Sequence, residues 1–176
     1  KNVKACYQNK TNQLRFNFTL LIVPKSANQI SRRYAMPTSD EIRQNISKSA
    51  ENFKQTVTTF NGDWSAAPDD ENWSAQQVAE HTVKAISFFA RIVSETMQSR
   101  PPEKVESEFP TQADAIAAHD SAIAILDRVF RYVEDRDLGK PVDRSDENEW
   151  PATIEGAMTR SYTHFDEHAE QINSLK

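Results

Sequence analysis

Glycine and cysteine are both scarce in this sequence, and each scarcity narrows the class of fold. Only 3 of the 176 residues are glycine. Folds built from β-strands usually need many glycine-containing turns, so this composition favours helices, as does a charged fraction of 27%. The single cysteine, Cys6, excludes a disulfide scaffold and argues against thiol chemistry on the chain's own cysteine. The length predicts one ordinary domain with its own core.

Acidic residues are missing from the first 35 positions. Residues 1–35 contain seven lysines and arginines and no acidic residue, whereas the rest of the chain has 14 basic and 26 acidic residues, a net charge of −12. A chain body with this charge is unsuited to reading nucleic acid. The longest apolar run, FTLLIV at residues 18–23, is too short to cross a bilayer, and no clear signal-peptide cleavage site follows it.

Residues 1–35 also lack helical periodicity, so we predict that they are a basic, poorly structured N-terminal extension outside the fold. The alternative is a short strand or arm that packs on the domain. The domain itself is then residues 36–176. With no spanning segment and an acidic body, we expect a cytoplasmic protein whose partners include neither nucleic acid nor a membrane.

Four segments of the domain have the apolar periodicity of a helix. Each begins at a residue suited to cap a helix or just after a proline, and they cover about residues 38–61, 74–100, 111–139 and 152–176. Four helices, each with one apolar stripe, bury those stripes most simply against each other. The sequence therefore predicts an all-α fold, a four-helix bundle.

Histidine is rare as well, with four in the whole chain, and its placement suggests a site. His81, His119 and His168 fall within apolar stripes, and His164 lies one turn before His168. Side chains at i and i+4 project from one helix face about 6 Å apart, close enough to hold a single ion. Such a pair alone is a weak motif, because it also occurs on solvated faces.

Position along the helices strengthens this interpretation. His81 lies about two turns into the second helix, while His164 and His168 lie in the last turns of the fourth. If these helices run antiparallel, all three imidazoles arrive at the same end of the bundle. Three protein ligands leave further positions of a divalent ion to water or substrate, as in catalytic sites. Nitrogen ligands favour Zn, Ni, Cu or Fe over Ca or Mg. The ordinary alternative for each residue is a buried neutral histidine bonded to a backbone carbonyl.

The segment HFDEH also matches the H-x-x-E-H pattern of one class of zinc protease. That class requires a third, acidic ligand well downstream and a much larger α/β scaffold, but only eight residues follow His168. Glu167 also points away from the face that its two neighbouring histidines share, because one helical step is 100°. We therefore do not favour a protease.

Two stretches, NWSAQQVAEHTVKAISFF and THFDEHAEQI, resemble the second and last helices of the DinB-like superfamily, also called YfiT-like. The resemblance covers about residues 38–176. It implies that His81, His164 and His168 are metal ligands and that a crossover joins the second and third helices, which then run parallel (up-down-down-up). It also implies a metal-dependent transferase or hydrolase that acts on a small molecule, with Zn or Ni and with a low-molecular-weight thiol as a candidate cofactor.

The same topology would carry His119, near the start of the third helix, to the metal end. There it could act as a general base, an extra ligand or a polar neighbour of the metal. The alternative is a purely structural role. Arg160 could meet an anionic substrate or simply lie on the surface. Four carboxylates adjoin histidines in sequence and could orient them, although each is as well explained by solvation: Glu80, Asp120, Asp166 and Glu170.

A function of another class also fits the sequence. In that alternative the chain is a non-catalytic helical bundle that forms a homodimer or binds a partner, and its metal site is vestigial or structural. The three tryptophans lie near helix ends: Trp73 is suited to a hydrophobic staple, and the others, Trp64 and Trp150, either cover the core or line a pocket.

Overall fold

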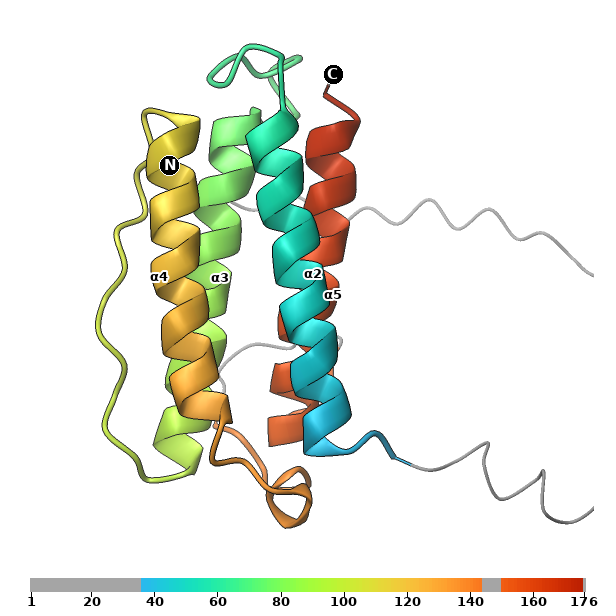
Figure 1. Cartoon of the computed structure of the whole chain (residues 1–176), viewed down its shortest axis with the longest axis vertical. Helices are drawn as coiled ribbons and strands as arrows, with labels where there is room; N and C mark the ends of the chain where they lie inside the picture. Colours follow the sequence, from blue (N-terminus) through green and yellow to red (C-terminus); the bar gives the residue numbers. More distant parts are fainter. Residues whose placement is uncertain (1–35, 144–149, 176) are drawn as a thin grey trace, which may run out of the picture. The chain divides into compact units, whose positions relative to one another are not determined.

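The computed structural model describes residues 36–143 and 150–175, and this part of the chain is helical (Figure 1). Its elements are the helices α2 (Ser39–Thr59), α3 (Ala75–Thr96), α4 (Gln112–Phe130) and α5 (Ile154–Asn173) and the short 3-10 helix η2 (Asp135–Asp137). Among these residues the only β-pairing is an isolated antiparallel bridge between Pro141 and Thr153. The predicted all-α four-helix fold is confirmed. The predicted extension, residues 1–35, lies outside the described residues.

The helix starts follow the capping signals of the sequence. At each of the first three helices, a hydroxyl accepts a hydrogen bond from the backbone of the residue three positions on, and that residue's side chain bonds back to the cap; the pairs are Thr38 with Glu41, Ser74 with Gln77 and Thr111 with Asp114. Such a cap contributes about 1 kcal/mol to stability. Thr153 caps α5 in a simpler way, by accepting from the backbone N–H of Gly156 at 3.1 Å.

Polar contacts at one end of the bundle fix the helix directions. The Gln112 amide at the start of α4 donates to the Phe60 carbonyl at the end of α2 (2.7 Å). The backbone N–H of Phe109, just before α4, donates to Glu80 in the first turns of α3 (3.0 Å). Helices α3 and α4 therefore begin at the same end and run in the same direction, joined by a long segment that passes along the bundle (Figure 1). Helices α2 and α5 run the other way.

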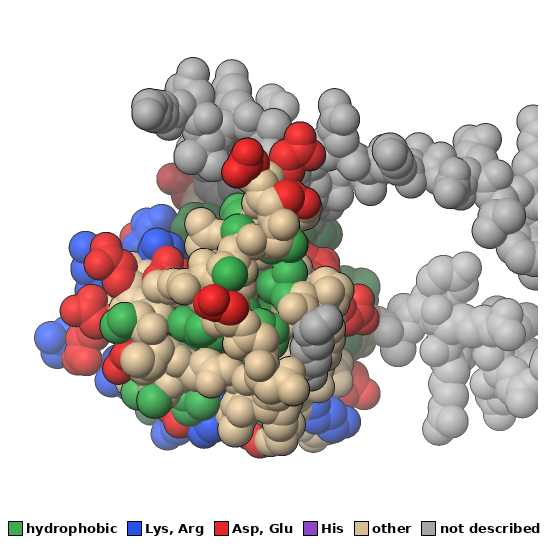
Figure 2. Space-filling view, turned by 90° about the horizontal axis from the view of Figure 1, so that it is seen from above, with side chains coloured by type: hydrophobic (Ala, Val, Ile, Leu, Met, Phe, Trp, Pro, Cys, Tyr) green, Lys and Arg blue, Asp and Glu red, His purple; other side chains and the backbone are tan. Residues whose placement is uncertain are grey.

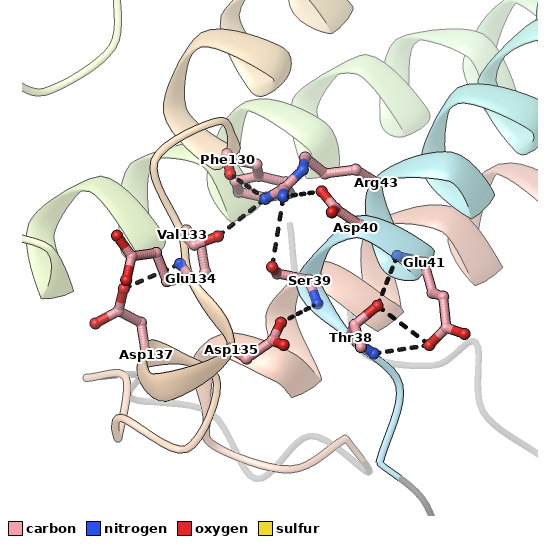
Figure 3. A network of polar contacts seen from close by, with 10 residues as sticks. All are labelled: Thr38, Ser39, Asp40, Glu41, Arg43, Phe130, Val133, Glu134, Asp135 and Asp137. Carbon is pink, nitrogen blue, oxygen red and sulfur yellow. Dashed lines mark hydrogen bonds and ion pairs between the residues drawn. The ribbon is translucent and has the colours of Figure 1, made fainter.

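The third helix is shorter than the sequence predicted. It ends at Phe130 instead of continuing towards residue 139, because the chain turns there to cover the start of α2 (Figure 3). Arg43 of α2 donates to the carbonyls of Phe130 and Val133 at 3.0 and 2.9 Å, and Asp135 accepts from the backbone N–H of Ser39 at 2.8 Å. A backbone N–H at the start of α2 and a backbone carbonyl at the end of α4, which have no partner within their own helices, are thus hydrogen-bonded across these two segments.

The second helix also ends early, at Thr96 and not near residue 100. Gln98 has a φ of 53°, a left-handed conformation that stops a helix. The Ser94 hydroxyl then donates to the Arg100 carbonyl at 2.9 Å, which holds the start of the crossover against α3.

Helix α3 buries a broader face than the predicted stripe. Each of α3 and α2 packs against both α4 and α5. Because α3 has two neighbours, the centre of its buried face falls on Val83 and Ile86. His81, which the sequence placed within the apolar stripe, is half-buried. His81 therefore lies at the edge of the core. None of the described helices is long and apolar enough to cross a membrane.

Candidate metal centre

Three of the four histidines meet between α3 and α5. His81 projects from α3, and His164 and His168 project from α5. One ring nitrogen of each residue lies within 4.8 Å of the corresponding nitrogens of the other two. The ring centroid of His81 is 5.0 Å from the ring centroids of His164 and of His168. The ring centroids of His164 and His168 are 4.3 Å apart. The antiparallel arrangement of α3 and α5 brings together the residues that the sequence singled out.

The cluster lies between α3 and α5, about two turns in from the end of the bundle where α3 begins, and it is largely buried. His164 is 7% exposed, whereas His81 and His168 are half-buried. The sequence placed His168, and not His164, in the apolar stripe, yet His164 is the more buried of the two. Phe89 of α3, whose ring centroid is 6.1 Å from that of His164, contributes to this burial. Figure 2 views the end where α3 and α4 begin, and no histidine is visible among the described residues there.

Hydrogen bonding leaves nitrogen lone pairs for an ion. The Nδ1 atom of His168 lies 2.8 Å from Oε1 of Gln171, and an amide oxygen only accepts, so Nδ1 carries the proton and Nε2 keeps its lone pair. His164 has both ring nitrogens buried and without a hydrogen-bond partner among the described residues. A buried polar atom without a partner costs about 1–3 kcal/mol. Three imidazoles with one nitrogen each this close together could hold a divalent transition-metal ion.

The three imidazoles are held neutral, which is the form that binds metal. Burial, followed by the neighbouring His168 and His81, lowers the pKa of His164 to about 2. Burial and the nearby His168 lower the pKa of His81 to about 4. Burial also lowers the pKa of His168, although Gln171 opposes that shift. Protonation therefore does not compete with an ion near neutral pH.

His119 is not brought to this cluster. It lies in α4, 4% exposed, with its ring stacked on Phe53 (5.7 Å between centroids) and edge-on to Phe165 (5.5 Å). Its Nδ1 is 3.4 Å from Asp120, and its Nε2 is buried without a partner among the described residues. Burial lowers its pKa. The proposed roles of His119 as a base or extra ligand gain no support from this geometry, because it faces the core between α2 and α5.

None of the four carboxylates considered as partners of the histidines is bonded to a histidine of the cluster, and only Asp120 contacts a histidine, His119. Glu80 accepts from the Phe109 backbone (3.0 Å), Asp120 pairs with Lys54 (2.8 Å), Asp166 accepts from Ser49 (2.9 Å), and Glu170 is exposed. The side chain that does bond to a histidine of the cluster is Gln171, which the sequence analysis did not single out. Its position three residues after His168, on the same helix face, is the signal that could have identified it.

Arg160 and Glu167 flank the cluster along α5. Glu167 accepts from Nη1 and Nη2 of Arg160 at 2.6 and 2.7 Å, and its side chain is 56% exposed. The carboxylate of Glu167 is thus engaged by Arg160, whereas the corresponding glutamate of a zinc protease acts as the general base. Arg160 also donates to Thr163 at 3.1 Å, and its charge contributes to the lowered pKa of each of the three clustered histidines.

Aromatic rings border the cluster on both sides. The ring of Trp73 is 4.8 Å from that of His81, and Phe89 lies between His164 and Trp150, 5.8 Å from the latter. Both tryptophans are half-buried against the core. Trp64 is half-buried too and donates from its indole nitrogen to the Phe109 carbonyl (3.0 Å), away from the histidines. Trp73 therefore has a second contact beyond the helix start that the sequence predicted.

Comparisons with known proteins agree with this fold. The sequence model of the DinB superfamily matches residues 40–172. A crystal structure described as the conserved protein of locus from Enterococcus faecalis is similar, with a TM-score of 0.54 and 15% identity, over 80% of this chain and 96% of that one; at this identity the likeness concerns the fold alone. No curated protein matches the chain. A family match over most of the bundle, with three clustered histidines that could bind a metal, shows that the chain belongs to the DinB superfamily.

Proposed function

We propose that this protein is a metal-dependent enzyme, a transferase or hydrolase, that acts on a small molecule. His81, His164 and His168 hold one divalent transition-metal ion, Zn or Ni, through one nitrogen each. The observation that carries the proposal is His164, whose two buried nitrogens have no partner among the described residues while the two other imidazoles lie beside it. A structural histidine in a core is normally hydrogen-bonded.

A donor set of three neutral nitrogens suits a reactive site better than a structural one. When bound, the ion would lower the pKa of a bound water or of a low-molecular-weight thiol and so supply a nucleophile near neutral pH. Gln171 holds His168 in the tautomer that presents Nε2. Trp73 and Phe89 flank the cluster and limit the access of water to it.

Metal analysis of purified, dialysed protein tests the site. We expect one Zn or Ni ion per chain in the wild type and less than a tenth of that in the His168→Ala variant. His119→Gln is the matched control, because it removes a histidine that lies outside the cluster and should leave one ion bound. Full metal content in His168→Ala would contradict the proposal.

Assays with the metal-loaded protein test the chemistry. An activated ester reports hydrolysis, and an alkylating electrophile offered together with a low-molecular-weight thiol such as cysteine reports transfer. The His168→Ala variant sets the background rate for both reactions. If the loaded wild type does not exceed this background with any member of a panel of such substrates, the site is a structural one and the enzymatic part of the proposal is wrong.

A further inference from the structure

We propose that Arg160 determines ligand specificity at this centre, by favouring a ligand that carries a negative charge next to its metal-binding atom, such as a carboxylate, over a neutral one. This inference rests on the proposed metal site and names the class of molecule that the site takes. Arg160 acts here through its charge, without a role in bond making or breaking.

The position of Arg160 follows from helix geometry. It lies one turn before His164 and two turns before His168, so the three side chains share one face of α5. Its side chain is 18% exposed. Because Glu167 accepts from both Nη atoms, the guanidinium is drawn along the helix towards residue 167 and lies beside the turn that carries His164.

Charged side chains near the cluster set the field that a ligand would meet. Three neutral imidazoles leave the full double charge on a bound divalent ion. By their positions on the helices, two cations of the described residues lie near the cluster: Arg160, one turn before His164, and Lys84, three residues after His81. Glu167, one residue before His168, is already paired with Arg160. The positive charges of the ion and of Arg160 therefore attract an anionic ligand more strongly than a neutral one.

A structural role of the Arg160–Glu167 pair makes a different prediction. If the pair only fastens two turns of α5, removing either partner weakens the helix, and ligand binding changes in the same direction in both variants. If charge is what matters, the two removals act in opposite directions. Loss of the arginine weakens anion binding, whereas loss of the carboxylate strengthens it, because Glu167 no longer offsets the guanidinium charge.

The experiment uses the full chain loaded with Co²⁺, whose visible absorption reports changes at the metal. We titrate azide as the anionic probe and imidazole as the neutral one, after measuring cobalt content. Arg160→Gln should raise the azide dissociation constant about three- to tenfold, and Glu167→Gln should lower it by a similar factor. The imidazole constant should change less than twofold in both. Arg131→Gln, which removes an arginine of an exposed ion pair on the other side of the fold, should change neither constant.

The outcomes separate this inference from the proposed function. Absence of cobalt uptake by the wild type contradicts the metal site, and the inference with it. Normal uptake with azide constants that shift in the same direction in both variants, or with equal shifts for azide and imidazole, leaves the metal site intact but overturns the role of Arg160.

Discussion

Replacing His164 by leucine should make the metal-free protein more stable. Two buried ring nitrogens without partners disappear, and leucine fills the space between Phe89 and the neighbouring imidazoles with apolar atoms. Each such nitrogen costs about 1–3 kcal/mol. We take the lower end because His81 and His168 beside it are only half-buried. The expected gain is about 1–2 kcal/mol, or roughly 3–6 °C in the unfolding midpoint for a domain of this size.

With metal bound, the wild type should instead be more stable than His164→Leu. A ligand that binds only the folded state at a concentration a thousand times its dissociation constant stabilises by about 4 kcal/mol. The wild type should gain this stabilisation when Zn²⁺ or Ni²⁺ is added, and His164→Leu should gain none. Thermal unfolding followed by circular dichroism, once with a chelator and once with excess metal, measures both effects in the same samples.

His119 provides the matched control for this experiment. It is equally buried and also has a ring nitrogen without a partner among the described residues, but it lies outside the cluster. His119→Leu should therefore stabilise the metal-free protein and keep the full response to metal. The reasoning is refuted if His164→Leu lowers the metal-free stability by more than about 1 kcal/mol, or if it keeps the metal response.

Three other predictions concern single residues. Gln171→Leu should weaken metal binding about tenfold, because the tautomer of His168 is no longer fixed, and a competition titration with a chelating dye measures this. Gly156→Ala should cost about 3 kcal/mol in urea unfolding, because a Cβ there would collide with the Pro151 carbonyl. The metal-free protein should lose stability as the pH falls from 7 to 5. The reason is that His119 takes up a proton near pH 6.5 in the unfolded chain, whereas burial lowers its pKa and keeps it neutral in the folded protein. The urea midpoint should therefore fall less over this pH range in His119→Leu than in the wild type.

Each of these has a control or a contradicting result. Glu170→Gln changes the exposed neighbour of Gln171 and should not alter metal affinity. Gly139→Ala should change stability by less than about 0.5 kcal/mol, since nothing lies within 4 Å of an added Cβ there. A stability that is constant or rises between pH 7 and 5 would contradict the pKa argument, because the carboxyl groups whose pKa is lowered titrate below this range.

The hydrogen bonds that cap the starts of α2, α3 and α4 are local, so the sequence could predict them. Each cap at Thr38, Ser74 and Thr111 is a contact between residues three positions apart, and such contacts need no tertiary information. The ends of α3 and α4 were harder to predict. Helix α4 stops where its last carbonyls meet Arg43, a residue 87 positions away from Phe130. No local signal encodes that contact.

The sequence by itself determined the helical class, the helix starts and the three histidines to watch, because these depend on composition, short-range hydrogen bonds and a short motif. Only the tertiary structure decided that His81, His164 and His168 meet while His119 does not. The reason is that convergence depends on which helices are neighbours and on how each is rotated, and the packing of all four helices fixes both. The packing also left both ring nitrogens of His164 buried and without a partner among the described residues.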